Sequence, residues 1–563
     1  MNRDTVLGKL ATRTRFDVLV IGAGVNGAGV FRDLAAQGLA VLLVDKGDFG
    51  SGTSAASSHL AHGGIRYLEY GEFRLVREAV QERNRLLSNA GHLVKPLPTA
   101  MPLRTRGSGL LNAPLRFLRL RDRASPRGAW VVRTGLAFYS LFSNAVANNL
   151  PGHKVLNRTD VGRLLPHLTT DLKACALYHD ALILHPERLI WELVAEGMQR
   201  ARQCLALNHV SVTGMSDAQV ELRDEATGRE LVVEPRIVVN AAGPWIDRVN
   251  SNLGQASRLI GGTKGSHLVL DHPNLFAALG GHMIFFEAAD GRIVLICPFH
   301  DRVLLGTTDI RTDDPDADQC TREEEAYLLG LVPQVFPGIQ ADAQHVVYRY
   351  CGVRPLGRGE GEAGQISRDH SLHLSRGAGP TPPVLSLVGG KWTTFRAFAE
   401  QATDRVLGEL GRQRTSATGD MPIGGGGDLP STKADRERAI RNTTLAGRLT
   451  LTDAEALYGR YGATAVAVAK ACSRPGMDER LPGSRYLAGE VAHICRTEMV
   501  ACLGDIVQRR TLMAMLGEAT PELLEAVARM AAPILGWSEE RRQREIKETA
   551  HILARRHGVQ NLP

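Results

Sequence analysis

The chain has 563 residues, of which 44% are hydrophobic and 23% charged, and its formal net charge is +7 at pH 7. This length exceeds what one hydrophobic core supports, so we expect two or three domains of ordinary globular composition. The modest positive charge suits an anionic small molecule or an anionic membrane surface as well as nucleic acid, so charge alone does not select a partner.

The N-terminal segment, the longest apolar stretch and the cysteines argue against a secreted protein, a membrane-spanning protein and a metal-binding protein. The N-terminal segment MNRDTVLGKLATRTR has positive charge but lacks the apolar core of a secretory signal. No stretch supplies the roughly eighteen uninterrupted apolar residues of a membrane span, and the nearest one, 130–142, is broken by Arg133. The eight cysteines show neither CxxC spacing nor a histidine at ligand spacing. We expect buried free thiols, a reduced cytoplasmic compartment, no metal site and at most peripheral membrane attachment.

Residues 16–45, FDVLVIGAGVNGAGVFRDLAAQGLAVLLVD, predict a dinucleotide-binding βαβ unit. An apolar strand leads into Gly22, Gly24 and Gly27, and a helix and a second strand follow. The first glycine allows a tight turn, the second lets the backbone approach a pyrophosphate, and the third lets the helix pack closely on the strand. Asp45 ends the second strand, where a carboxylate can accept hydrogen bonds from ribose hydroxyls.

Small residues and a glycine corner follow this unit. In GDFGSGTSAASS, residues 47–58, the hydroxyls of Thr53 and Ser54 can approach phosphates or a flavin. The corner HGGIRYLEYGE precedes a helical run over 73–87 with a predicted buried face at Phe73, Val76, Val80 and Leu87.

Residues 101–133 carry eight arginines against one aspartate. Such a segment is typical of a solvated basic face, and the functional alternative is an amphipathic surface that docks on anionic lipid headgroups. Nucleic acid fits it less well, and we expect no nucleic-acid partner.

Later segments return to strand-and-glycine patterns. Apolar strands end at AAGPW, 241–245, and at GGKWTTF, 389–395, and they flank short strands at 263–270, 283–287, 292–298 and 303–308. The short strands predict an antiparallel sheet in a separate substrate-bearing layer. Gly424 to Gly427 read as a linker, and 432–557 is patterned as helix.

The interrupted pattern indicates FAD. A nicotinamide enzyme would continue its first βαβ unit with further βα units in one domain, whereas here the parts return only at 238–243 and 384–391. The residues predicted to bind the cofactor are Gly22, Gly24, Gly27, Asp45, Thr53, Ser54, Ala242, Gly243, Gly390 and Thr393.

Taken together, VIGAGVNGAG, SSHLAHGGIRYLEYGEFRLVREA, NAAGPW, KGSHLVL, LLGTTD, CGVRPL, ISRDHSL and GGKWTTFRAFAE resemble a known family. It is the FAD-dependent, quinone-linked (aerobic) glycerol-3-phosphate dehydrogenases, within the flavoprotein superfamily that includes D-amino acid oxidase. The resemblance covers about residues 16–405, and the family also carries a helical C-terminal segment. The chain departs from many relatives in having Asp45 in place of Glu, which keeps the ribose acceptor, and in a short polar extension at its start.

The resemblance implies an α/β fold with three parts. A discontinuous Rossmann-like FAD-binding domain would comprise residues 14–90, 182–255 and 350–410. A substrate domain with an antiparallel sheet would comprise residues 91–181 and 256–349. A helical C-terminal domain would comprise residues 430–563.

The implied reaction is oxidation of sn-glycerol 3-phosphate to dihydroxyacetone phosphate, by hydride transfer from C2 to atom N5 of FAD, with electrons passed to a membrane quinone. The protein would be cytoplasmic and peripheral on the cytoplasmic face of the membrane. A glycerol-3-phosphate oxidase that uses O₂ is the alternative, and a flavin-bearing binding protein without turnover is a third hypothesis. The sequence is compatible with a homodimer but does not give the oligomeric state.

The resemblance also places Arg66, Tyr67, Arg354, Arg368 and Lys391 around the substrate, where arginine forks suit a phosphate dianion. Catalytic roles fall to His62, Arg354 and Lys391. His62 is the first candidate for the base that accepts the proton of the C2 hydroxyl, with Lys264 and His267 as weaker alternatives. Arg354 can stabilise charge that grows on the substrate oxygen.

Overall fold

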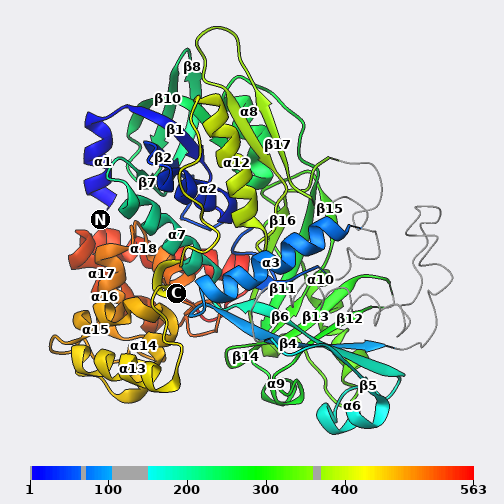
Figure 1. Ribbon diagram of the computed structural model, residues 1–563. Coiled ribbons are helices and arrows are strands. Elements are labelled where there is room, and N and C mark those ends of the chain that lie inside the picture. Colours follow the sequence, from blue (N-terminus) through cyan, green and yellow to red (C-terminus); the bar gives the residue numbers. More distant parts are fainter. Residues whose placement is uncertain (1–2, 65–71, 104–149, 289, 359–368, 563) are drawn as a thin grey trace, which may run out of the picture.

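The computed structural model describes residues 3–64, 72–103, 150–288, 290–358 and 369–562. Within these ranges lie two β-sheets and a group of C-terminal helices, which occupy the top, the lower right and the lower left of Figure 1. The predicted α/β class with a helical C-terminal domain is confirmed. Arg66, Tyr67 and Arg368 lie outside the described residues, as does most of the basic segment, from residue 104 on.

The smaller sheet carries the predicted dinucleotide unit. Its order is β17-β18-β10-β1-β2-β7, with β9 paired to β10 and β8 to β9. The five strands from β18 to β7 run parallel, and β17 is antiparallel to β18. The bounds are β1 Arg15–Ile21, β2 Val41–Val44, β7 Leu205–Leu207, β8 Val210–Ser216, β9 Gln219–Asp224, β10 Glu230–Asn240, β17 Ser371–Ser375 and β18 Val384–Val388.

Helix α2 (Val25–Ala36) packs against both α7 (Pro186–Arg200) and α12 (Phe395–Glu409) beside this sheet (Figure 1). The parallel strands β2, β7 and β18 are buried along their whole length, as expected for parallel strands covered on both faces, whereas β9 and β17 expose every second residue. Gly29 shows how closely the helices approach, because a Cβ there would lie 2.8 Å from the ring of Phe395. The α1 helix (Arg3–Thr12) and α8 (Ile246–Asn252) complete this part.

The larger sheet has the order β15-β11-β14-β13-β12-β4-β6-β3, with β16 paired to β11 and β5 to β6. Its neighbours are antiparallel except for β4 and β12. The strands are β3 Leu60–Ala61, β4 Val94–Leu103, β5 Lys154–Asn157, β6 Ala174–Ile183, β11 Gly262–Leu270, β12 Met283–Glu287, β13 Ile293–Phe299, β14 Arg302–Gly306, β15 Ile310–Thr312 and β16 Val346–Arg354. Its helices are α6 Arg158–Leu164, α9 Pro273–Ala278, α10 Arg322–Leu329 and α11 Val332–Val335.

The division into domains stays a prediction, and β16 runs across the proposed boundary at residue 350. Helix α3 (Phe73–Asn89) forms where the sequence predicts it. Its buried side includes Val76 and Val80, but Phe73 at its first turn is 36% exposed, so the predicted buried face does not reach the N-terminal end.

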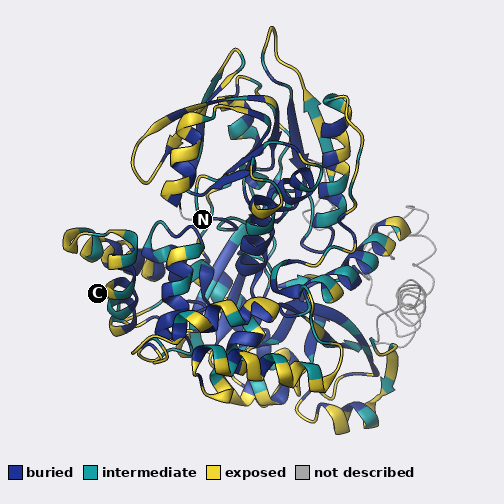
Figure 2. Ribbon diagram, turned by 60° about the vertical axis from the view of Figure 1, so that its left-hand side comes forward, coloured by how far each residue is buried: buried dark blue, intermediate teal, exposed yellow. Residues whose placement is uncertain are grey.

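The C-terminal helices pack on the larger sheet. Buried side chains of α17, such as Leu523 and Val527, share one apolar cluster with Val269 of β11 and Leu295 of β13. Figure 2 shows the central strands buried and the outer helix faces exposed. The helices are α13 Lys433–Gly447, α14 Leu451–Tyr461, α15 Ala465–Cys472, α16 Ala488–Thr497, the π-helical turn η7 Asp505–Arg510, α17 Pro521–Leu535 and α18 Glu539–His557.

The glycines at 424–427 connect the domains but are not a flexible linker. A Cβ on Gly425 would lie 1.9 Å from the carbonyl oxygen of Tyr461, and one on Gly426 would lie 2.0 Å from that of Asn89. Both glycines are buried. At these two glycines the backbone contacts the backbone at Tyr461 and Asn89, and no side chain would fit between them. The stretch is therefore tightly packed and does not behave as a free linker.

Two further expectations concern the thiols and the membrane. All eight cysteines are free, and each is buried except Cys502, which is half-buried. Within the described ranges, no helix has the length and apolar character needed to cross a membrane.

Candidate active site and cofactor cavity

The parallel strands of the smaller sheet deliver the predicted cofactor residues to one edge. Ile21 of β1 pairs with Val44 of β2 and with Asn240 of β10, so the three strands end together. Parallel strands present their carboxyl ends on the same side, where ligands of such sheets bind. The segments beginning at Gly22, Asp45, Ala241 and Gly389, distant in sequence, therefore meet.

Two glycines of the fingerprint, Gly22 and Gly27, occupy positions that exclude a side chain. Gly22 has φ +96°, and a Cβ there would lie 2.7 Å from the carbonyl oxygen of Ala241. A Cβ on Gly27 would lie 1.8 Å from the carbonyl oxygen of Gly22, which is the close helix–strand contact expected from the sequence. Gly24 precedes α2, and the Ser54 hydroxyl accepts a hydrogen bond of 3.0 Å from the N–H of Val25.

Asp45 is held in place as an acceptor. Its Oδ2 accepts from the N–H of Ala23 at 2.6 Å and its Oδ1 from the N–H of Gly47 at 2.9 Å. Burial raises the pKa of the Asp45 carboxyl to about 6, although these two backbone donors oppose the shift. The carboxylate is thus fixed beside the glycine turn, and it is ionised at neutral pH.

A cavity of about 2330 Å³ runs along this edge and on toward the larger sheet. Ordinary small-ligand pockets have about 300–1,000 Å³, so this one can hold a dinucleotide together with a substrate. The glycine cradle, the fixed carboxylate and the helix N-terminus fit the pyrophosphate and ribose of FAD. Of the predicted cofactor residues, those that line the cavity are Gly22, Gly24, Asp45, Thr53, Ser54, Ala242, Gly243 and Gly390.

The other two predicted cofactor residues, Gly27 and Thr393, lie behind the wall. The Thr393 hydroxyl accepts from the N–H of His62 at 3.0 Å and lies 3.2 Å from the His62 carbonyl oxygen. Thr53 lines the cavity, but its hydroxyl donates to the carbonyl of Val353 at 2.6 Å and so ties the small-residue segment to β16. Both hydroxyls therefore position backbone around the cavity.

His62, Arg354 and Lys391 line the same cavity from three separate places in the chain. His62 follows β3, Arg354 ends β16, and Lys391 follows β18. The corner that carries His62 is anchored by Asp180 of β6, whose Oδ1 accepts from the N–H of Gly63 at 3.1 Å. This Asp180 anchor, which is itself buried, was not predicted, because no local pattern pairs residue 63 with residue 180.

The guanidinium of Arg354 has a defined orientation. It donates to Asp309 Oδ1 and to Thr307 Oγ1, each at 3.1 Å. The neighbouring strand makes room through Gly265, where a Cβ would lie 2.1 Å from an Arg354 nitrogen. The arginine fork is therefore set by its carboxylate and hydroxyl partners before any ligand binds.

Lys264 and His267 of β11 also line the cavity. The Lys264 ammonium forms an ion pair with Glu324 at 2.7 Å and donates to the carbonyl of Gln319 at 3.1 Å. His267 Nε2 lies 2.8 Å from the Ser58 hydroxyl, and its ring stacks on Tyr350. Burial, with the nearby Arg354 charge, holds the pKa of His267 well below its usual value, so the ring is neutral.

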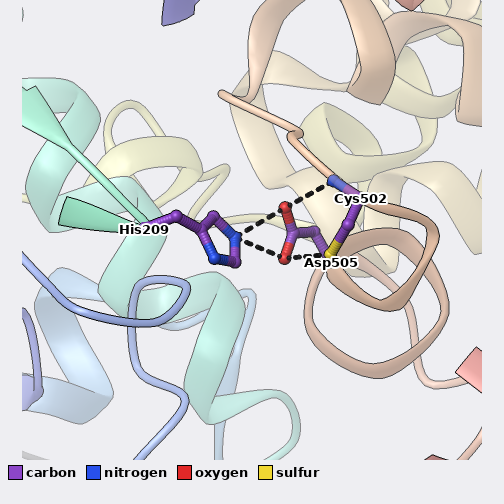
Figure 3. A group of neighbouring side chains, drawn as sticks. All are labelled: His209, Cys502 and Asp505. Carbon is purple, nitrogen blue, oxygen red and sulfur yellow. Dashed lines mark hydrogen bonds and ion pairs between the residues drawn. The ribbon is translucent and has the colours of Figure 1, made fainter. Parts of the chain in front are cut away.

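A part of the wall comes from the C-terminal domain, which sequence reasoning did not assign to the site. Cys502, Gly504 and Asp505 line the cavity beside His209, which follows β7. Figure 3 shows the His209 side chain, which follows β7, facing Asp505 of the C-terminal helices. His209 Nε2 lies 3.1 and 3.2 Å from the two carboxylate oxygens of Asp505. Burial opposes protonation of His209, but the Asp505 carboxylate outweighs it and raises the His209 pKa to about 9.

His209, Cys502 and Asp505 are close enough to share a metal ion, but the Asp505 carboxylate is already occupied. Besides His209, it accepts from the N–H groups of Ala501 at 2.8 Å and Cys502 at 3.2 Å and from the Cys502 thiol at 3.2 Å. Burial and the Asp505 charge raise the Cys502 pKa well above its usual value, so the sulfur stays protonated. The group is an ion pair with a thiol donor, in which every Asp505 oxygen has partners.

Two family descriptions and several known proteins match this chain. Residues 17–396 match the family described as FAD dependent oxidoreductase, and residues 416–542 match the C-terminal domain of alpha-glycerophosphate oxidase. The glycerol-3-phosphate dehydrogenase of Synechocystis sp. is 33% identical over 559 residues, covering 95% of this chain and 96% of that one. The D-erythritol 1-phosphate dehydrogenase of Brucella abortus is 32% identical over 503 residues, covering 88% and 94%.

Among solved structures, the glycerol-3-phosphate dehydrogenase of Bacillus halodurans in complex with FAD is similar over 98% of this chain and 97% of that one. The TM-score is 0.75 and the sequence identity is 25%. The similarity extends through the C-terminal helices, so the three-part arrangement is shared.

Proposed function

The chain belongs to the family of FAD-dependent glycerol-3-phosphate dehydrogenases, and on this premise we propose that it oxidises sn-glycerol 3-phosphate to dihydroxyacetone phosphate with a membrane quinone as electron acceptor. The observation that carries the proposal is one continuous cavity that holds both the glycine cradle with Asp45 and the oriented Arg354 guanidinium. A dinucleotide and an anionic substrate can therefore lie side by side.

Binding of the substrate phosphate is assigned to the cationic groups of the wall. Arg354 supplies a planar fork, and a phosphate binds its two terminal nitrogens by replacing their long contacts, both 3.4 Å, with the Thr263 hydroxyl and the Thr308 carbonyl. Asp309 and Thr307 fix the plane of that fork. Lys391 adds a second positive charge from the end of β18. Arg66, Tyr67 and Arg368 remain proposed partners of the phosphate from outside the described residues.

The chemistry needs a hydride acceptor and a base. FAD, when bound, supplies the acceptor atom N5 and the route by which two electrons leave. His62 is assigned to accept the proton of the C2 hydroxyl, because this residue lines the cavity and its backbone is fixed by Thr393. A base of this kind works best when its pKa is near the working pH. The low pKa of His267 makes that residue a poorer proton acceptor.

The electron acceptor and the membrane belong to the same proposal. A quinone is confined to a bilayer, so an enzyme that reduces it has to reach the membrane surface, here the cytoplasmic face. The basic segment 101–133 is the proposed contact, through attraction of its arginines to anionic headgroups. Sedimentation with anionic and neutral liposomes tests it, and binding that ignores lipid charge and salt would remove the segment from this role.

Reduction of the holoenzyme under anaerobic conditions tests the function directly. Glycerol 3-phosphate is expected to bleach the flavin absorbance, and an unchanged spectrum would exclude turnover. Reoxidation in a stopped-flow instrument then separates the acceptors. Rapid formation of hydrogen peroxide with air would favour an oxidase, whereas fast reoxidation by a soluble quinone and slow reaction with O₂ support the dehydrogenase.

A longer polyol phosphate is the second candidate substrate, since the relative from Brucella abortus is named for D-erythritol 1-phosphate. Both substrates carry a phosphate and an oxidisable secondary alcohol, so the Arg354 fork serves either one. The ratio of kcat/KM for the two compounds decides between them. A ratio above about 100 in favour of glycerol 3-phosphate, equivalent to ~2.7 kcal/mol, is expected for a dedicated glycerol-3-phosphate dehydrogenase.

A further inference from the structure

The ribose end of the cofactor cavity is built on a loop, residues 45–49, that two domains hold. On the side of the smaller sheet, Val210 N–H donates to the Asp45 carbonyl at 2.7 Å and His209 N–H to the Gly47 carbonyl at 2.8 Å. These bonds join the loop to the connection between β7 and β8. They fix the backbone but leave the buried carboxylate of Asp48 to be neutralised.

The charge on Asp48 is neutralised by the C-terminal domain. Arg510 reaches across and donates two hydrogen bonds to the Asp48 carboxylate, at 2.5 and 2.8 Å. Both side chains are buried, with exposed fractions of 0% for Arg510 and 3% for Asp48. A buried carboxylate whose cation is removed is strongly destabilised, so the conformation of this loop depends on Arg510.

Two further contacts connect the region around loop 45–49 to the C-terminal domain. Asn208 Nδ2 donates to Asp48 Oδ1 at 2.8 Å and to the Met499 carbonyl at 2.9 Å, which links the loop to the C-terminal domain a second time. The His209–Asp505 ion pair makes a third link one residue further along the chain. Asp48, His209 and Asp505 all line the cavity, so the links surround the position proposed for the cofactor ribose.

We infer that Arg510 and Asp505 of the C-terminal domain are positioning residues of the FAD site. They hold loop 45–49 so that the Asp45 carboxylate meets the ribose hydroxyls. The C-terminal helices therefore complete the cofactor site, beyond any role in assembly or membrane contact. The inference rests on the proposed placement of the ribose at Asp45.

Substitutions that keep size but change the link test this role. Arg510→Lys keeps the positive charge but loses the bidentate fork, and Asp505→Asn keeps the shape but loses the charge that faces His209. The dissociation constant of FAD is measured by titrating flavin into the apoprotein and following its fluorescence. We expect it to rise at least about tenfold in each variant, which corresponds to ~1.4 kcal/mol of binding free energy.

Glu490→Gln is the matched control. Glu490 is a buried carboxylate in a bidentate pair with Arg460, with both distances 2.7 Å, and that pair lies wholly within the C-terminal helices. If Glu490→Gln weakens FAD binding as much as the two test variants do, a general loss of stability of the C-terminal domain is the cause and the inference is overturned. Parent-like FAD affinity in both Arg510→Lys and Asp505→Asn overturns it as well.

Asp45→Asn separates the inference from its premise. The amide cannot accept from both backbone donors and two ribose hydroxyls as the carboxylate does. Weaker FAD binding in this variant supports the ribose assignment. Unchanged FAD affinity in Asp45→Asn with weakened affinity in Arg510→Lys would refute the role given to Asp45, while the C-terminal contribution to the site would stand.

Discussion

A methyl group at residue 265 should displace Arg354, the arginine proposed to bind the substrate, without altering that arginine itself. A Cβ built on Gly265 would lie 2.1 Å from one Arg354 nitrogen and 2.6 Å from the guanidinium carbon. Carbon and nitrogen at contact need about 3.5 Å, so the guanidinium has to retreat by roughly 1 Å or more in Gly265→Ala. A shift of that size breaks the 3.1 Å contacts with Asp309 and Thr307.

The expected loss is in catalysis. A displacement of about 1 Å at a positioning group costs about 100-fold in rate, and we expect kcat/KM for glycerol 3-phosphate to fall by that order. The clash falls on the far end of a flexible side chain that is partly exposed, so the melting temperature and the flavin content should change little. Steady-state assays with an artificial electron acceptor, together with the absorbance spectrum, measure all three.

Gly261→Ala is the matched control, because a Cβ there would lie 3.4 Å from the nearest atom, in Arg358, which is ordinary contact. It should retain the parent kcat/KM. Parent-like activity in Gly265→Ala would refute the claim that Arg354 binds substrate from its observed position. An equal loss in both variants would show that a general disturbance of the backbone around 261–265, and not displacement of the arginine, is responsible.

The other predictions concern the same cavity. Arg354→Lys should raise KM at least about tenfold and lower kcat while FAD stays bound, because an ammonium cannot form the fork; unchanged kinetics would remove Arg354 from the site. His62→Ala should slow flavin reduction about 100-fold or more with a smaller change in substrate affinity, and an unaltered reductive half-reaction in a stopped-flow instrument would refute its role as base. The His209 pKa is raised to about 9 by Asp505 against the opposing effect of burial, so the ion pair stabilises the fold fully below the unfolded value of about 6.5 and loses this effect as the pH rises through 9. The free energy of unfolding should therefore fall on the order of 2 kcal/mol more in the parent than in His209→Asn between pH 7 and 10, and parallel pH profiles would contradict the pairing.

The cofactor half of the site could be predicted from the sequence because its determinants are local. Gly22, Gly24 and Gly27 lie within one strand–turn–helix unit, and Asp45 ends the next strand. The steric reason for Gly22 and Gly27 is a contact with a neighbouring strand or turn, which the spacing already implies. The pairing of β1 with β10 and of β10 with β18 then confirms that the late glycine segments reach the same edge.

Only the tertiary structure decided what orients the reactive groups and what closes the cavity. Arg510 and Asp48 are 462 residues apart, and Arg354 meets Asp309 across 45 residues. No periodicity or motif records such pairs, because a buried ion pair requires only that two backbones bring opposite charges to one place. The sequence therefore determined the cofactor fingerprint and the resemblance to a family, whereas the link between the C-terminal helices and the ribose loop followed from how the domains pack.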